Sequence, residues 1–298
     1  MPGNFREIRR RIKGVKSTKQ ITKTMEMVSA SRMRRAQNAA LQIRAYAEKA
    51  LEILNSVAGK TGTVSHPLLE TREAKNTLVV LVTSDRGLCG GLNTNTINNV
   101  LKNVKGFSKE SVSFITIGKK GRDAMMRMGY KVVADFSGLK KFEFQDIWPV
   151  ISMVLNDYTS KKTDRVYLAY PNFINTLVQK PAFRLLLPLS EENLLVILHE
   201  LAGAKAATER KRAYEYKFEP GASQVLEGLL PRFTEMQVFK AVLESQASEH
   251  SARMAAMKNA TDAAEEIIDD LTFTYNQVRQ AGITSEIAEI STAAEALK

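Results

Sequence analysis

A glycine-rich loop at residues 83–93 has the residue types best suited to holding a ligand. It reads Thr-Ser-Asp-Arg-Gly-Leu-Cys-Gly-Gly-Leu-Asn, follows a buried-strand pattern and precedes a helical pattern. In α/β domains, backbone amides at such a helix start can hold phosphate groups. The glycine spacing, G-x-x-G-G, matches neither the dinucleotide fingerprint nor the P-loop. The pattern therefore favours a tight strand-to-helix turn, with a nucleotide site as the alternative.

The single cysteine, Cys89, is the obvious nucleophile in the sequence. A cysteine nucleophile needs a nearby base. The three histidines lie in dissimilar settings: His66 in a linker, His199 in a charged helical segment and His250 in a long helical run. No catalytic residue and no cofactor are predicted. One cysteine also excludes an internal disulfide and fits a reducing compartment.

Four carboxylates near the carboxyl terminus have a spacing that would suit a metal ion. Glu265, Glu266, Asp269 and Asp270 share one side of a predicted helix. The same spacing is typical of a solvated or salt-bridged helix face, which is the interpretation we favour. No metal site is predicted.

The charge distribution points to an acidic partner. The 298 residues carry a net charge of +11. Residues 1–57 hold 13 Lys and Arg against 4 Glu, whereas residues 232–298 hold 6 against 11 acidic residues. A basic coiled-coil protein that binds nucleic acid is the alternative function. Against it, only Phe5 supplies an aromatic ring in the basic segment, and no nucleic-acid-binding motif is present.

Two long helices must position these groups. Residues 232–298 contain no proline and one glycine, and residues 4–57 contain one glycine and no proline. Both have apolar residues at three- and four-residue steps, which predicts a coiled coil. Their opposite net charges predict that they pair with each other, and we expect an antiparallel arrangement. Exposed ion pairs contribute only about 0–1 kcal/mol each, so the apolar seam supplies most of the stability.

The spacing also predicts a register. If residue 57 lies near residue 232, paired residue numbers sum to about 289, which places the four carboxylates beside Lys19 and Lys23. On the amino-terminal helix, the apolar stripe changes phase near Lys19 and continues through Ile21, Met25 and Val28. Such a stutter is expected where a coiled coil locally unwinds.

The end of the carboxyl-terminal helix extends beyond its partner in this register. Roughly the last 13 residues lack a paired residue, which is an overhang of about 20 Å. This overhang carries an apolar stripe that would be unfavourable in water. We call this stripe the apolar tip, and we expect another protein to surround it. It consists of Ile283, Ile287, Ile290, Ala294 and Leu297.

The middle of the chain alternates strand and helix patterns. Strands are predicted at 77–82, 112–117, 131–136, 165–170 and 184–187, with helices to about 104 and at 119–128 and 144–155. Residues 190–212 are predicted to be helical, and 214–218 to form a strand. This order predicts a layered, Rossmann-like α/β domain with a mainly parallel sheet. The expected domains are an amino-terminal coiled-coil helix (1–58), an inserted α/β domain (59–221) and a carboxyl-terminal coiled-coil helix (222–298).

No apolar run approaches the roughly 20 residues that span a bilayer. Glu7 and the immediate helical pattern argue against a cleaved presequence.

Three segments resemble one family, the gamma subunit of the bacterial F-type ATP synthase. They are 6–37, 84–93 and 248–290. The third contains the family's I-T-x-E-x-x-E signature, Ile283, Thr284, Glu286 and Glu289. After Ile290 the family usually has Gly-Ala, where this chain has Ser-Thr-Ala-Ala. The difference affects the packing of the apolar tip.

The resemblance implies a role as the central rotor shaft that couples transmembrane ion flow to rotary catalysis. The implied partners are three alpha and three beta subunits, the epsilon subunit and the membrane rotor ring of c subunits. The chain would be peripheral at the cytoplasmic side of the cell membrane. It would be non-catalytic by itself.

Site residues follow from the same resemblance. Polar contacts with the alpha/beta ring near its centre are implied for Arg279, Gln280, Thr284 and Glu286. Lys23, Met25 and the loop containing Cys89 would face acidic levers of the beta subunits. The apolar tip would turn in a smooth socket, because apolar contact is non-directional.

Overall fold

The computed structural model describes residues 2–58, 66–139, 143–189 and 221–296. The expected helix at 190–212 and strand at 214–218 therefore lie outside the described residues. The chain divides into two compact units: residues 1–30 with 253–298, and residues 31–252. The predicted fold class is confirmed, since the long helices of both termini flank a Rossmann-like α/β domain in the sequence and pair antiparallel.

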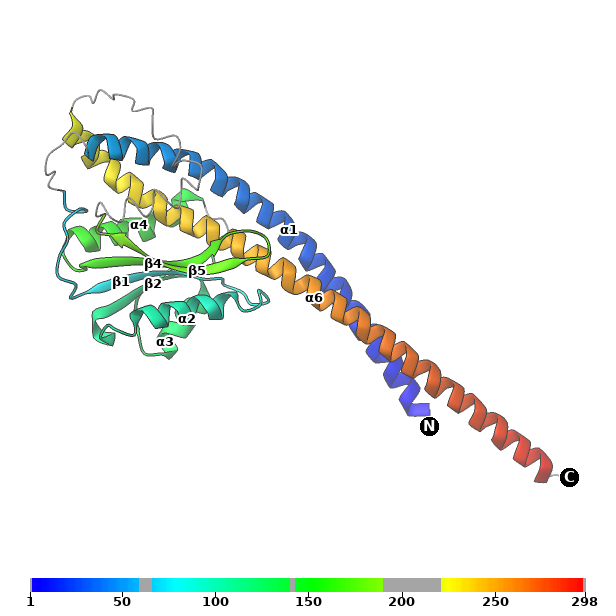
Figure 1. The fold of residues 1–298 in the computed structure, drawn as a ribbon. Coiled ribbons are helices and arrows are strands. Elements are labelled where there is room, and N and C mark those ends of the chain that lie inside the picture. The colour runs from blue at the N-terminus through cyan, green and yellow to red at the C-terminus, as the bar shows by residue number, and fades with distance from the viewer. Residues whose placement is uncertain (1, 59–65, 140–142, 190–220, 297–298) are drawn as a thin grey trace. The chain divides into compact units, whose positions relative to one another are not determined.

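The first unit is a pair of helical segments that lie side by side (Figure 1). They belong to α1 (Pro2–Ala58) and α6 (Ala222–Ala296). Thr22 of α1 faces Thr261 of α6, with 2.7 Å between their hydroxyl oxygens. Nearer the end of α1, the Phe5 ring lies edge-on to Tyr275 at 5.9 Å between centroids. A Cβ added at Gly282 would lie 3.3 Å from the same ring. These contacts form a seam between the two helical segments.

On α6 the seam follows the predicted stripe. Its buried or half-buried positions advance in alternating steps of four and three residues. Thr261, which interrupts the apolar pattern, is one of them, and its hydroxyl group also donates a hydrogen bond to the carbonyl oxygen of Met257 at 2.8 Å. The positions in this unit are Met257, Thr261, Ala264, Ile268, Leu271, Tyr275, Val278 and Gly282.

On α1 the predicted stutter is wrong. Thr22 and Ser29 are buried, whereas Ile21 and Val28 are 56% and 45% exposed. Heptad spacing therefore continues through the region without a change of phase. Small hydroxyl side chains can occupy a seam because they can donate a hydrogen bond within their own helix, as Thr22 does to the carbonyl oxygen of Lys19 at 3.0 Å.

The predicted register is also shifted. The Thr22–Thr261 pair sums to 283 rather than 289, a difference of about six residues. The expectation assumed that pairing begins near residue 232, but α6 begins at Ala222 and passes through Pro231 without ending. The expected charge pairing nevertheless holds at one point, because Lys19 Nζ lies 2.8 Å from Glu265 Oε1.

The second unit contains a five-stranded sheet in the order β3-β2-β1-β4-β5. Four strands are parallel, and β5 is antiparallel to β4. The first four strands begin where predicted, but β4 and β5 are longer than expected and form a hairpin. The strands are β1 (Thr77–Val82), β2 (Val112–Ile117), β3 (Lys131–Asp135), β4 (Arg165–Phe173) and β5 (Gln179–Leu187).

Helices cover both faces of the sheet (Figure 1). Val100 of α2 (Leu92–Val104) and Met125 of α3 (Lys119–Arg127) pack on one face. The other face is covered by α4 (Phe144–Thr159) and by the part of α6 that contains Phe233. A 3-10 turn, η1 (Lys109–Ser111), precedes β2. Because β1 is central and fully buried, the loop that follows it is held at the middle of the sheet's carboxyl edge.

Candidate functional site

The apolar tip extends past the last paired position of α6. Gly282 contacts Phe5, and every described residue from 283 to 296 is exposed. Ile283, Ile287 and Ile290 are 48%, 62% and 69% exposed. Ala294 is also exposed, and Leu297 lies outside the described residues. The tip therefore presents an unburied apolar stripe, the kind of surface that marks an interaction site.

The predicted polar contact residues lie just before and within the same segment of α6. Arg279, Gln280, Thr284 and Glu286 are all exposed. The Thr284 hydroxyl group donates to the Gln280 carbonyl oxygen at 2.9 Å, so part of its hydrogen bonding is satisfied within the helix. Charged and amide groups at these positions can bind a partner without disturbing the paired seam.

On α1, exposed apolar side chains accompany the predicted contacts. Lys23 is exposed and lies 3.1 Å from the Glu26 carboxylate, and Met25 is half-buried. Ile21 and Val28, one heptad apart, are more exposed than Met25, although the apolar pattern predicts them in the seam. Hydropathy periodicity alone could not find this outward stripe, because small hydroxyl residues take the inner positions.

In the loop after β1, the Cys89 side chain points inward, whereas a residue that contacts a partner would face outward. The Cys89 side chain is buried, and its sulfur accepts a hydrogen bond from Asn93 Nδ2 at 3.3 Å. Its neighbour Leu88 is 62% exposed and has a φ of +64°. The outward-facing apolar side chain of this loop is therefore Leu88 rather than Cys89.

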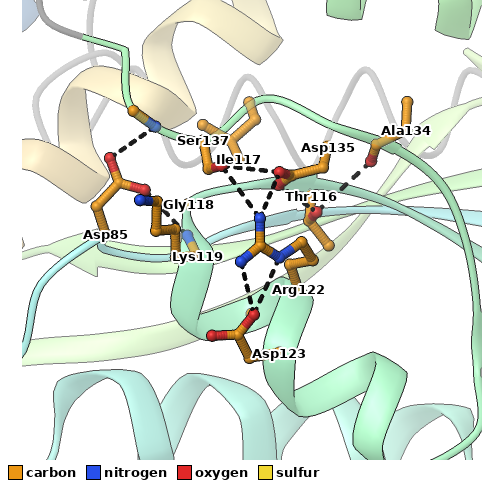
Figure 2. A network of polar contacts seen from close by, with 12 residues as sticks. Asp85, Thr116, Ile117, Gly118, Lys119, Arg122, Asp123, Ala134, Asp135 and Ser137 are labelled. Atoms are coloured by element: carbon orange, nitrogen blue, oxygen red, sulfur yellow. Dashed lines mark hydrogen bonds and ion pairs between the residues drawn. The ribbon is translucent and has the colours of Figure 1, made fainter.

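Polar contacts join this loop to the segments that follow β2 and β3 (Figure 2). The Asp85 carboxylate accepts hydrogen bonds from the backbone amides of Lys119, at 3.0 Å, and Gly138, at 2.9 Å. Beside it, Arg122 donates to Asp123 and Asp135. These two hydrogen bonds raise the pKa of Arg122. A carboxylate from the chain itself thus occupies the amino terminus of α3, where an α/β domain could otherwise hold a phosphate.

The remaining candidate residues for chemistry are the four carboxylates near the carboxyl terminus and the histidines. Among the described residues, no group of three or more His, Cys, Asp or Glu side chains could hold a metal ion. Glu265 is paired with Lys19, and Glu266, Asp269 and Asp270 are exposed. His66 Nδ1 accepts a hydrogen bond from the Leu68 amide at 3.1 Å. His199 lies outside the described residues.

Comparisons with known proteins identify the family. A family model described as ATP synthase matches residues 4–297. The chain is 43% identical to the ATP synthase gamma chain of Pelotomaculum thermopropionicum, with 99% of each chain covered. It is 44% identical to that of Roseiflexus castenholzii, with 98% of each covered. This chain belongs to the ATP synthase gamma chain family. The nucleic-acid alternative gains no support from these matches.

Two solved structures share the fold of this gamma-chain family member. A chain of the Tetrahymena thermophila mitochondrial ATP synthase central stalk and c-ring matches with a TM-score of 0.55 and 25% identity, covering 80% of this chain and 99% of that one. A chain of the Euglena gracilis mitochondrial ATP synthase structure that includes F1 and the c-ring matches with a TM-score of 0.66 and 23% identity, covering 100% and 95%. Within the described residues, no helix has a stretch long and apolar enough to cross a membrane.

Proposed function

We propose that this gamma chain is the central rotor shaft of its ATP synthase. In this role it couples ion flow through a membrane rotor ring to ATP synthesis or hydrolysis in the alpha/beta ring. The observation that supports this most directly is the apolar tip, which continues α6 beyond Gly282 as an exposed helix with an apolar stripe. A helix of this kind needs a surrounding protein to bury it.

The tip and the outward stripe of α1 contact a ring of three alpha and three beta subunits. Around the tip, Arg279, Gln280, Thr284 and Glu286 supply polar contacts near the centre of the ring. Exposed Ile21 and Val28 add apolar contacts beside Lys23 and Met25. The basic surface of α1, which includes Arg9 and Arg10, binds acidic segments of the beta subunits, because complementary charges favour association in the right orientation.

The helix pair is suited to transmitting conformational change because its surface differs from side to side. Lys19 and Glu265 form an ion pair on the surface of the pair, whereas Ile21 and Val28 present apolar side chains. Three identical beta subunits around such a shaft meet different surfaces, so their nucleotide sites take different conformations. Rotation then passes each site through the same series of states.

The chain performs no bond-breaking itself. Its α/β domain contacts the epsilon subunit and the rotor ring, which makes the chain peripheral at the cytoplasmic side of the cell membrane. At the amino terminus of α3, where a phosphate group could otherwise bind, the Asp85 carboxylate already accepts the amide hydrogen bond of Lys119.

Reconstitution tests this function. The purified chain alone should hydrolyse no ATP, and adding it to a mixture of alpha and beta subunits should restore steady hydrolysis at one chain per three beta subunits. Failure to co-assemble would overturn the proposal. Sequence-preferring DNA binding that weakens steeply with salt would favour the nucleic-acid alternative instead.

A further inference from the structure

The loop at residues 84–91, which we call the Leu88 loop, is fixed at both ends by one side chain. Asn93, in the first turn of α2, accepts a hydrogen bond from the Ser84 amide at 3.1 Å. Its Nδ2 group donates to Ser84 Oγ at 2.7 Å and to Cys89 Sγ at 3.3 Å. Ser84 Oγ in turn donates to the Arg86 carbonyl oxygen at 2.6 Å. The ends of the loop are therefore held while its middle faces outward.

The Asp85 side chain attaches the loop to the rest of the domain at a second place. Its two carboxylate oxygens accept hydrogen bonds from the Lys119 amide, which opens α3, and from the Gly138 amide, which follows β3 (Figure 2). One side chain thus joins the ends of three neighbouring strands. Amide hydrogen bonds to a charged carboxylate are stronger than neutral ones, and a helix amino terminus favours the negative charge.

Leu88 is in a backbone conformation that is unfavourable for a residue with a Cβ atom. Its φ of +64° lies in the left-handed region, which disfavours residues with a Cβ atom. Its side chain is 62% exposed, so little internal packing offsets this strain. Strained residues that a rigid surrounding structure holds in place are concentrated at functional sites.

We propose that Asp85 is a positioning residue that holds Leu88 outward as the side chain through which this loop contacts a subunit of the alpha/beta ring. The inference rests on the proposed function and replaces Cys89 with Leu88 as the contact residue. The exposed cations Lys119 and Lys120 lie at the start of α3, beside the attachment of Asp85. The receiving surface is therefore an apolar pocket with an acidic rim.

The test compares Leu88 and Asp85 variants in the reconstituted complex. Leu88→Ala should raise the chain concentration needed for half-maximal ATP hydrolysis about tenfold, because an apolar contact is lost. Asp85→Asn keeps the side-chain size but removes the charge, and it should raise that concentration severalfold. Because Asp85 acts through Leu88, the double variant should match Leu88→Ala within about twofold. Multiplied effects would overturn the positioning role.

Amide hydrogen exchange separates positioning from general stability. In Asp85→Asn, amides of the Leu88 loop should exchange faster while those of β1 and β2 keep their wild-type rates. Asp123→Asn is the matched control. The Asp123 carboxylate accepts hydrogen bonds from the Arg122 side chain, whereas Asp85 accepts them from backbone amides. It should leave both the loop's exchange and the half-maximal concentration unchanged. Equal acceleration throughout the sheet in Asp85→Asn would contradict the proposal.

Leu88→Gly keeps the test decisive even if Asp85→Asn folds poorly. Glycine tolerates positive φ, so this variant should melt at an equal or slightly higher temperature while assembling as weakly as Leu88→Ala. Wild-type assembly by Leu88→Gly would overturn the contact role. If the wild-type chain itself failed to assemble with alpha and beta subunits, the proposed function would fail instead, so the two failures are distinguishable.

Discussion

Introducing two charges on the apolar tip gives the sharpest test of the rotor role. Ile287 and Ile290 are 62% and 69% exposed, and fully burying an isoleucine side chain contributes about 1.5–3 kcal/mol. Burying the exposed two-thirds of each should therefore stabilise assembly by about 1–2 kcal/mol, or about 2–4 kcal/mol for the pair. At 1.4 kcal/mol per factor of ten, Ile287→Asp with Ile290→Asp should weaken binding to the alpha/beta mixture about 30- to 700-fold.

The assay is sedimentation of the complex at increasing chain concentration, with thermal unfolding of the isolated chain measured in parallel. Because both isoleucines are exposed, the free energy of unfolding should change by less than about 0.5 kcal/mol. Ser285→Asp with Thr292→Asp is the matched control. At 100° per residue these positions lie on the opposite side of the helix from the stripe. Binding that is weakened equally by both pairs of substitutions, or that is unchanged by the isoleucine pair, would refute the proposal that the ring buries the apolar tip.

Three further predictions concern the stability of the isolated chain, measured by denaturant unfolding. Thr22→Val or Thr261→Val alone should lower the free energy of unfolding by about 1 kcal/mol, because the hydrogen bond between the two hydroxyl groups is lost; the double variant should lose little more, because that shared bond is already gone in either single variant. Gly282→Ala should raise it by up to about 1 kcal/mol, because helix propensity improves and the Phe5 ring, 3.3 Å from the new Cβ, can shift. Burial lowers the pKa of His66 below 6.5, so stability should fall as pH decreases from about 6.5 towards that lowered value.

Each of these predictions has a contradicting outcome. Additive losses in the threonine double variant would mean that the two hydroxyl groups do not act as a pair. A loss of stability in Gly282→Ala would mean that the ring of Phe5 cannot move. For His66, the unfolded state binds more protons within the stated pH range, so His66→Gln should flatten the pH dependence there. An unchanged profile would contradict this assignment.

The sequence predicted the helices and most strands because periodicity reflects burial over many residues. Register was predicted less well. It depended on where pairing begins, and α6 begins at Ala222 rather than near residue 232. The prediction of the apolar stripe on α1 was wrong for a different reason. Hydropathy ranks Ile21 and Val28 above Thr22 and Ser29 as candidates for buried positions. Close helix packing instead selected the small residues that can satisfy their own hydroxyl groups.

The candidate site was predictable only in part. The apolar tip could be found because it extends a long periodic pattern beyond its partner. That Leu88 faces outward while Cys89 is buried could not be predicted, because it depends on a positive φ and on the orientation of two adjacent side chains. Asp85 was equally hidden, since its amide partners come from two other strand ends.

The outward placement of Ile21, Val28, Ile283, Ile287 and Ile290 has a consequence for how the protein is produced. A newly made chain that has not met its neighbours displays these side chains to the crowded cell interior. Such surfaces promote self-association and capture by quality-control machinery. Synthesis of this chain in excess of the other subunits should therefore yield aggregates or degradation products. The cell must make this chain and its partner subunits in matched amounts.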